Sequence, residues 1–354
     1  MDIKTAAQAR MFANRLKKRY RHLHKWAKRS NLDAFRLYDR DIPEIPLVLD
    51  LYGDIISGAL YQRPYEKDEE EENEWLAAMK NAMSQSLELN KDSIIIKRRQ
   101  RQRRAFGSRQ LQYEKISSQA IVRTVSEGQL KFKVNLSDYL DTGLFLDRRV
   151  MRSMVRAESC SKRVLNLFCY TASFSVYAAS GGAAATDSVD LSNTYLGWAQ
   201  ENFALNDCIA KITRLESFFT KLENRNSGRN NNSHNLIRAD VWAFLRAAKA
   251  ERRHWDLIIL DPPAFSNSTM SRTDFDLQKD LPELLGNCLT LLAEGGKLLF
   301  STSARSFKTS AADIENSLAG RFTGITVSDI SDKLIDEDFR GKKPPRTFLI
   351  VASE

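Results

Sequence analysis

The pattern of apolar and polar residues differs between the front and the rear of the chain. In the front, an apolar stripe at helical spacing predicts a helix over residues 5–29, and its members are Phe12, Leu16, Tyr20, Leu23 and Ala27. A second helix is expected over residues 74–89. Apolar and β-branched runs predict short strands at 34–38, 47–51, 54–61, 93–97, 116–123 and 129–135. The last two strands are expected to pair around the turn Glu127-Gly128.

From about residue 137, continuous apolar runs alternate with helical patterns. The runs predict strands at 163–168, 184–190, 235–239, 255–261 and 297–301. Helices are expected at 171–180, 192–206, 241–250 and 281–292. Apolar strands that are separated by helices indicate a doubly wound, mostly parallel α/β sheet. Residues 208–233 are expected to form an inserted loop, and Gly295-Gly296 a turn before the last strand.

Composition and charge define what kind of chain this is. With 42% apolar and 28% charged residues, the 354-residue sequence is typical of a globular protein and not of a disordered one. We expect a cytoplasmic protein, since no apolar run is long enough to span a membrane and the N-terminus has no apolar signal core. The net charge of +9 arises entirely in residues 1–136, which hold 27 Lys and Arg against 18 Asp and Glu.

This asymmetry predicts three parts. We expect a basic N-terminal helix (1–30), a small α+β domain (31–136) that shares its positive charge and suits a polyanion, and a neutral second domain (137–354); the family resemblance described below implies that these two domains bind the RNA substrate and catalyse the reaction. The four cysteines form no CxxC pair, and no histidine lies at zinc-ligand spacing, so neither a metal site nor a disulfide framework is expected.

Two basic runs in the front are candidates for polyanion contact. Nine Lys and Arg and no acidic residue occur from residue 10 to 29, and six of the eight residues 97–104 are cationic. The candidate RNA-binding residues are Lys17, Lys18, Arg19, Arg98, Arg99, Arg101, Arg103 and Arg104. A charge run is more often a solvated face, and charge alone does not separate RNA from DNA or from a membrane surface. No RNP aromatic pair or GXXG clamp accompanies the charge.

Candidate chemistry lies at the ends of the rear strands, where ligands of such sheets bind. The turn that follows the strand 163–168 lacks GxGxxG and GxxxxGK[ST], which argues against an oxidoreductase with a nicotinamide cofactor. Asp190 ends the next strand and is placed to accept hydrogen bonds from ribose hydroxyls. Asp240 and Val241 follow the third strand, where they suit an adenine amino group. An acid at such a position is more often a helix cap, but several at one edge indicate a ligand site.

The fourth strand ends in Asp261-Pro262-Pro263-Ala264-Phe265. The prolines fix the backbone of this loop, and the aromatic ring is placed to stack on a planar base. We expect Asp261, Pro262, Pro263 and Phe265 to be the catalytic residues.

These motifs carry a resemblance to a known family. The segments 166–171 (NLFCYT), 189–192 (VDLS), 239–240 (AD) and 261–268 (DPPAFSNS) resemble class I S-adenosylmethionine-dependent methyltransferases. Together with 135–149, 11–16 and 35–39, they resemble the RlmK half of the bacterial RlmKL enzymes, which are related to RlmI-type enzymes. The resemblance implies a Rossmann-like, mostly parallel seven-stranded sheet behind a smaller α+β domain, with S-adenosylmethionine as the cofactor.

The resemblance also implies which residues contact the cofactor. They are Thr142, Gly143, Phe145, Asp147, Arg149, Asn166, Phe168, Tyr170, Thr171, Ala172, Asp190, Leu191, Ser192, Asp240, Val241 and Asp261. Ala172 departs from the family pattern, because relatives commonly have Gly at this position.

By the same resemblance, the expected activity is methylation of a base of 23S rRNA, most directly at guanine N7. Adenine N6 is the main competing atom, and cytosine C5 is less suited because it needs a cysteine nucleophile, which the Asp-Pro-Pro loop lacks. A catalytically inactive RNA-binding relative is a further alternative. The partner is expected to be 23S rRNA or an assembly intermediate of the large subunit. Without an RlmL half in this sequence, targeting would rest on the basic front or on a separate RlmL-like protein.

Overall fold

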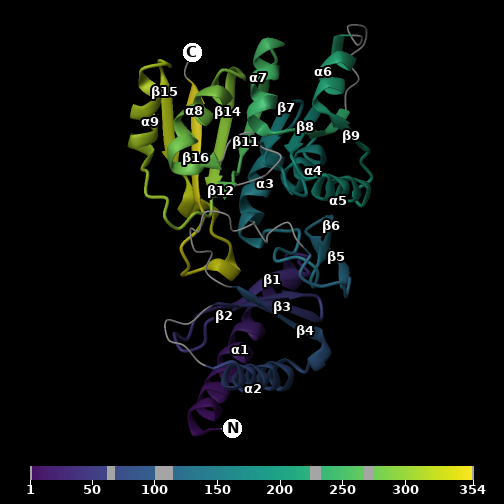
Figure 1. The fold of residues 1–354 in the computed structure, drawn as a ribbon, viewed down its shortest axis with the longest axis vertical. Coiled ribbons are helices and arrows are strands. Elements are labelled where there is room, and N and C mark those ends of the chain that lie inside the picture. Colours follow the sequence, from purple (N-terminus) through teal and green to yellow (C-terminus); the bar gives the residue numbers. More distant parts are fainter. Residues whose placement is uncertain (1, 62–67, 100–114, 224–232, 267–274, 353–354) are drawn as a thin grey trace. The chain divides into compact units, whose positions relative to one another are not determined.

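The computed structural model describes residues 2–61, 68–99, 115–223, 233–266 and 275–352. The chain divides into two compact units (Figure 1). Unit 1 comprises Met1–Thr142 and, in addition, Glu337–Arg340 from near the C-terminus. Unit 2 comprises Gly143–Asp336 and Gly341–Glu354. The division thus falls after Thr142, six residues beyond the boundary expected from charge, and the basic N-terminal helix belongs to unit 1.

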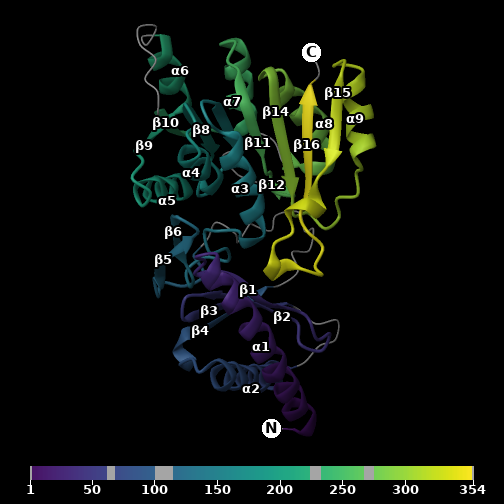
Figure 2. The same cartoon turned by 180° about the vertical axis from the view of Figure 1, so that it is seen from behind.

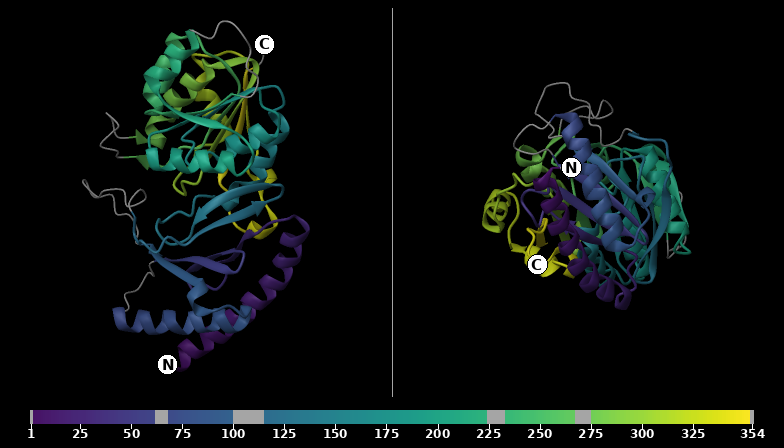
Figure 3. Two further views of the ribbon diagram at one scale, coloured as in Figure 1. Left: turned by 90° about the vertical axis from the view of Figure 1, so that its right-hand side faces the viewer. Right: turned by 90° about the horizontal axis from the view of Figure 1, so that it is seen from below.

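Unit 1 is a four-stranded sheet covered by two helices. Its strands β1 (Ala34–Asp39), β2 (Leu47–Tyr52), β3 (Ile55–Tyr61) and β4 (Ile94–Arg99) lie in chain order. The helices α1 (Ile3–Arg29) and α2 (Glu69–Leu87) pack on the same face of this sheet (Figure 3). Phe12, Leu16 and Leu23 of the expected stripe are fully buried in the core between them, whereas Tyr20 is only partly buried.

Two elements of unit 1 differ from expectation. Helix α2 begins at Glu69, because Asp68 caps it by accepting a hydrogen bond from the Glu71 amide at 2.7 Å, and the acidic run forms its first turn. The hairpin of β5 (Val122–Glu127) and β6 (Leu130–Asn135) turns at Glu127-Gly128 as expected. However, no strand forms over residues 116–121, so the predicted strand 116–123 was wrong over most of its length.

Unit 2 is a doubly wound α/β sheet, which confirms the expected fold class. Its eight strands have the order β15-β16-β14-β11-β7-β8-β10-β9. Their bounds are β7 (Arg163–Leu167), β8 (Ala185–Asp190), β9 (Ala210–Arg214), β10 (Ser233–Arg238), β11 (Trp255–Leu260), β14 (Leu292–Thr302), β15 (Ile325–Asp329) and β16 (Arg346–Ala352). Strand β16 lies between β14 and β15 and runs antiparallel to both, whereas the other neighbouring strands of this sheet are parallel (Figure 2).

Helices cover both faces of this sheet, because alternate residues of the buried strands point to opposite sides. Ile258 and Leu260 of β11 belong to one core cluster, and Leu257 and Ile259 to another. The first cluster is shared with α7 (Val241–Ala250), α8 (Leu277–Leu289), α9 (Ala311–Ala319) and Phe218 of α6 (Leu215–Glu223). The second is shared with α3 (Arg149–Glu158) and α4 (Ser173–Ser180). Helix α5 (Asn193–Ala204) begins at the expected Ser192 cap.

Two predictions for unit 2 need correction, and a third falls outside the described residues. The expected inserted loop at 208–233 contains β9 and α6, so the sheet has eight strands and not seven. The expected turn Gly295-Gly296 lies within β14. The Asn-rich tract 224–232 lies outside the described residues. No described helix is long and apolar enough to cross a membrane.

Candidate active site

The candidate site lies at the carboxyl edge of the unit 2 sheet. Strand β7 comes first along the chain and is flanked by β8 on one side and β11 on the other. The chain continues from β7 to β8 on one side and later crosses from β10 to β11 on the other, so the strand order reverses at β7. In doubly wound sheets, the ligand crevice lies at the carboxyl ends of the strands where the order reverses. The segments that follow β7, β8, β10 and β11 contain most of the residues expected from the sequence.

The turn after β7 is tightly wound without glycine. Phe168, Tyr170 and Ala172 have φ values of 55°, 53° and 55°, in the left-handed region that costs L residues about 1–2 kcal/mol each. Surrounding hydrogen bonds hold the turn, since the Cys169 amide donates to the Val189 carbonyl at 3.0 Å and the Ala172 amide to the Cys169 carbonyl at 2.8 Å. Ala172 is completely buried, so its methyl group fills space where the family pattern has Gly.

Asp190 connects the ends of β7 and β8. Its two carboxylate oxygens accept hydrogen bonds from the amides of Tyr170 and Ser192, each at 2.9 Å. Burial raises the pKa of Asp190 to about 6, although these amide donors and that of Leu191 act to lower it. An acidic group in this position suits the hydroxyl donors of a ribose.

The segment before α3 forms another wall of the site. Gly143 has φ +100°, and a Cβ there would lie 2.3 Å from Cζ2 of Trp198. The buried Thr171 hydroxyl donates to the Gly143 carbonyl at 2.6 Å. The side-chain amide of Asn166 in β7 donates to the Ser175 hydroxyl of α4 at 2.9 Å. The side chains of Thr171 and Asn166 thus help to hold the site together.

Aromatic rings continue from this wall. The Phe145 side chain is 41% exposed, and its ring centroid lies 5.3 Å from that of Tyr170. The Tyr170 ring in turn meets Tyr195 edge to face at 4.4 Å. Phe145 therefore offers an accessible aromatic face beside the turn after β7, whose Tyr170 amide Asp190 holds.

The Asp-Pro-Pro loop is anchored by an arginine that our sequence analysis missed. Arg148 closes the short 3-10 helix Leu146–Arg148 and donates from Nε and Nη2 to the two carboxylate oxygens of Asp261, at 3.0 and 2.9 Å. Its Nη2 also donates to the Ser303 hydroxyl, just beyond β14, at 3.0 Å. One buried guanidinium therefore ties together the segment before α3, the end of β11 and the end of β14.

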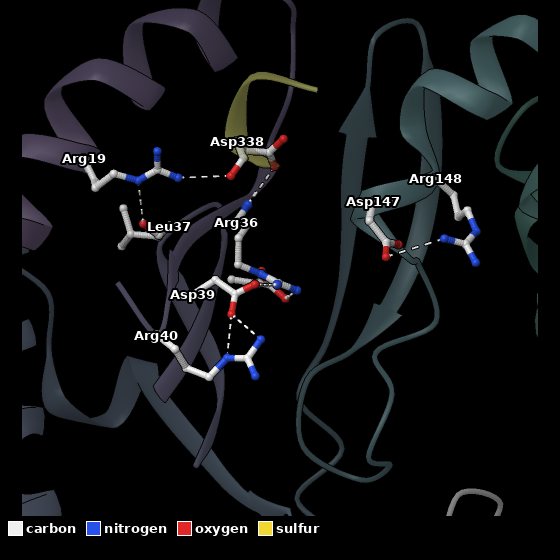
Figure 4. A network of polar contacts seen from close by, with 9 residues as sticks. Arg19, Arg36, Leu37, Asp39, Arg40, Asp147, Arg148 and Asp338 are labelled. Atoms are coloured by element: carbon white, nitrogen blue, oxygen red, sulfur yellow. Dashed lines mark hydrogen bonds and ion pairs between the residues drawn. The ribbon is translucent and has the colours of Figure 1, made fainter. Parts of the chain in front are cut away.

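Nearby carboxylates keep the Arg148 guanidinium protonated. Burial lowers the pKa of Arg148, but the carboxylates of Asp261 and Asp147 outweigh burial, and the pKa lies above its usual value. The Asp147 carboxylate lies 3.6 Å from Nη1 of Arg148 (Figure 4). The doublet Arg148-Arg149 is the one sequence feature that could have pointed to Arg148. The resemblance implied a site role for Arg149 only. Arg149 is itself buried and pairs with Asp336 at 2.7 Å.

The other expected residues are distributed as follows. Asp240 caps α7 by accepting from the Ala243 amide at 3.0 Å, and Val241 is buried in the core. Ser192 caps α5. Thr142 belongs to unit 1, where its hydroxyl bonds that of Tyr52 at 2.8 Å.

In the Asp-Pro-Pro loop, Pro262 is buried and Pro263 half-buried. Phe265 begins strand β12 (Phe265–Ser266), which pairs with β13 (Phe275–Asp276). The loop therefore leads from β11 directly into a short hairpin.

The basic residues expected to bind RNA do not share one environment. Lys17 and Lys18 are exposed, whereas Arg19 is half-buried and donates to the main-chain carbonyls of Leu37 and Asp338 at 3.3 and 3.0 Å (Figure 4). Arg98 contacts Asn73 at 2.7 Å, and Arg99 pairs with Asp141 at 2.7 Å. Arg101, Arg103 and Arg104 lie outside the described residues.

Comparison with known proteins identifies the class that this fold and site define. Residues 90–304 match the model of the S-adenosylmethionine-dependent methyltransferase family. The chain belongs to this family, and S-adenosylmethionine is its cofactor.

The chain is similar to particular members. It is 42% identical over 339 residues to "Ribosomal RNA large subunit methyltransferase K" of Neisseria meningitidis, covering 96% of this chain and 86% of that protein. It is also 42% identical over 343 residues to "Ribosomal RNA large subunit methyltransferase K/L" of Pseudomonas fluorescens, of which it spans 40%.

Solved structures support the fold alone. The methyltransferase SMU.776 in complex with SAH aligns with a TM-score of 0.69 at 23% identity, over 97% of this chain and 82% of that one. A methyltransferase from Streptococcus mutans aligns with a TM-score of 0.70 at 23% identity, over 97% of this chain and 81% of that one.

Proposed function

We propose that this methyltransferase modifies a base of large-subunit (23S) rRNA, at N7 of a guanine. The observation that carries the proposal is the 42% identity to the Neisseria protein over 96% of this chain. When bound, S-adenosylmethionine supplies a sulfonium methyl group. The residues of the site fit this cofactor, because Asp190 offers an acidic acceptor and Phe145 an accessible aromatic ring, and both contact Tyr170 in the turn after β7.

The anchoring of Asp261 supports N7 as the target atom. Both of its oxygens accept hydrogen bonds from Arg148, whose pKa lies above its usual value, so the Asp261 carboxylate is held in a fixed position as an acceptor. Guanine N7 carries no proton, and its methylation leaves no proton for the enzyme to remove. The protein then has to position the base and exclude water, for which a fixed Asp-Pro-Pro loop suffices.

The cysteines argue against the cytosine C5 alternative. Cys169 is the one that lies in the turn after β7, and burial, together with the Asp190 carboxylate, raises the pKa of its thiol well above the usual value. Burial likewise raises the pKa of Cys288, in α8, and that of Cys208. A nucleophilic cysteine needs a lowered pKa, so these thiols do not suit attack on a pyrimidine ring.

A product analysis tests the proposal. The purified protein is incubated with labelled S-adenosylmethionine and deproteinised 23S rRNA, and the nucleosides are separated by mass spectrometry. We expect 7-methylguanosine. N6-methyladenosine would instead support the competing amine chemistry. Cofactor binding without any transfer would support an inactive RNA-binding relative.

The K/L relatives suggest how the activity is delivered. Because the chain spans only 40% of the Pseudomonas protein, the remaining part of such relatives has no counterpart in this match. We infer that an RlmL-like protein, when present, acts on the same assembly intermediate in the cytoplasm. Adding it to the transfer reaction with ribosomal precursor particles should raise the rate if delivery depends on it.

A further inference from the structure

Helix α1 divides its cations into two groups with different environments. Arg15 pairs with Asp41 at 2.8 Å, and Arg19 donates to two main-chain carbonyls of unit 1. From residue 10 to the end of the helix, the seven other Lys and Arg residues are exposed, and among the described residues none of them makes an ion pair; they are Arg10, Lys17, Lys18, Arg21, Lys25, Lys28 and Arg29. We call these seven residues the α1 basic stripe.

The stripe follows from the position of the buried face. The apolar residues of α1 are centred on one side of the helix and packed into the unit 1 core. At 100° per residue, the seven cations fall within about 120° on the opposite side. From Arg10 to Arg29 they extend over about 28 Å of helix. No acidic residue occurs anywhere within α1.

When no ligand neutralises the α1 basic stripe, repulsion between its cations destabilises the folded protein. Cations at i and i+4 or i+3 repel each other, as Arg21 with Lys25, Lys25 with Lys28, and Lys25 with Arg29 do here, by about 0.2–0.5 kcal/mol per pair. Elsewhere in unit 1, exposed cations such as Arg98 have carboxylates within 4 Å. The absence of compensating carboxylates along the described α1 stripe indicates that its counter-charge comes from a ligand.

We propose that the α1 basic stripe binds the phosphate backbone of the RNA substrate, without reading its sequence. This inference rests on the proposed function for the choice of RNA. A linear row of charges about 28 Å long passes several successive phosphates, whose spacing along one strand is about 3.4 Å in a duplex. The stripe consists of flexible Lys and Arg side chains and contains no aromatic ring on which a base could stack. Such side chains suit contacts with phosphates and not with bases.

An anionic membrane is the less suitable partner. Membrane-surface helices insert their apolar face between lipids. The apolar face of α1 is already buried against the sheet and α2, with Phe12, Leu16 and Leu23 fully inaccessible. Only electrostatic attraction would remain, whereas RNA offers the stripe a high linear charge density.

The proposal also reassigns individual residues. Arg10, Arg21, Lys25, Lys28 and Arg29 join Lys17 and Lys18 as phosphate contacts. Arg19 is not expected to contact RNA, because its guanidinium donates to main-chain carbonyls within unit 1.

The test measures how RNA binding depends on salt. The variant Arg10→Gln/Lys17→Gln/Arg21→Gln/Lys28→Gln neutralises the centre of the stripe while keeping good helix formers. A matched control removes four exposed cations of unit 2 in the full chain, as Lys211→Gln/Arg214→Gln/Arg246→Gln/Lys249→Gln. Binding to a fluorescent fragment of 23S rRNA is followed by anisotropy from about 50 to 300 mM salt, with thermal unfolding as the folding check.

We expect the stripe variant to lose about 3 from the slope of log affinity against log salt, since each phosphate contact contributes about 0.7–0.9. Its affinity at low salt should fall at least about tenfold, while calorimetric binding of S-adenosylmethionine stays unchanged. The control should keep the wild-type slope. An unchanged slope in a folded stripe variant, or an equal loss in the control, would overturn the proposal.

Two further outcomes are distinguishable. A stripe variant that loses affinity for vesicles of anionic lipid but not for RNA would identify a membrane as the partner and end the proposal. A wild-type protein that binds RNA through the stripe yet transfers no methyl group to it would refute the proposed function but not this inference.

Discussion

The cations of α1 and the arginines around the Asp-Pro-Pro loop show what positively charged side chains do in two environments. The seven lysines and arginines of the α1 basic stripe are exposed to solvent, and none makes an ion pair among the described residues. In unit 2, Arg148 and Arg149 are buried, and each is bound to a carboxylate. Exposed charges can be exchanged at small cost to the fold, so they are free to serve a ligand. Buried charges are costly unless paired, so they fix the geometry around them.

The largest test of this comparison is the removal of Arg148. Arg148→Gln leaves Asp261 without its two strong donors, and we expect a loss of unfolding free energy that approaches the ~3–5 kcal/mol of a broken buried pair. Because Asp261 is partly exposed, the loss should lie at the lower end. Methyl transfer in single turnovers should fall much more than cofactor affinity, since the loop is no longer positioned.

A conservative variant separates positioning from folding. Arg148→Lys keeps the charge but cannot reproduce the bidentate geometry. If it restored full transfer, the fixed orientation of Asp261 would be unimportant. The four-site stripe variant on α1, by contrast, should leave the unfolding free energy within about 1 kcal/mol of wild type.

The second test adds a methyl group to the tightly packed site of unit 2. In Gly143→Ala, the new Cβ would lie 2.3 Å from the Trp198 ring at φ +100°, and overpacking with strain should cost about 2–4 kcal/mol. Gly53→Ala is the matched control, because its φ is +62° but nothing lies within 4 Å of an added Cβ. That variant should lose only about 1–2 kcal/mol in chemical denaturation. Equal losses would show that space around Gly143 is not limiting.

The third test uses pH. The pKa of Asp190 is about 6 in the folded protein, so this carboxylate, which we propose accepts the ribose hydroxyls, is increasingly protonated below pH 6. Cofactor affinity should therefore decrease as pH falls through 6, by up to about tenfold per unit. Calorimetric titrations of Asp190→Asn should show weak binding without this dependence.

The free energy of unfolding should respond to pH in the opposite direction from cofactor affinity. A raised carboxyl pKa favours the protonated form in the folded state, so its contribution is present below the unfolded pKa and is lost as pH rises through about 6. Relative to Asp190→Asn, the wild type should lose stability between pH 4 and 6. A constant difference over that range would contradict the buried environment of Asp190.

The smallest expected effect concerns Ala172. Ala172→Gly relieves a left-handed backbone but gives up a buried methyl group and adds freedom to the unfolded chain, so unfolding free energy should change by less than about 1 kcal/mol. Cofactor affinity should stay within about threefold of wild type. A large gain in affinity would mean that the methyl group narrows the methionine slot.

The sequence predicted what depends on local pattern and missed what depends on distant partners. The strands that end at Asp190 and Asp261 were found from continuous apolar runs, and the α5 cap from Ser192. Strand β9 was missed because it is a five-residue edge strand with exposed Lys211 and Ile212, which gives no apolar run. The role of Arg148 could not be read from the sequence, since Asp261 and Ser303 are 113 and 155 residues away.

The segment Glu337–Arg340 has a consequence for how the protein is made. The Asp338 carboxylate accepts from the Arg36 amide at 2.8 Å, its carbonyl from Arg19 at 3.0 Å, and Phe339 lies against the Arg36 guanidinium at 5.0 Å. These groups belong to the fold of unit 1, but residues 143–336 of unit 2 separate them in the sequence from the rest of that unit. The rest of unit 1 therefore cannot reach its final packing until residues 337–340 have also been synthesised.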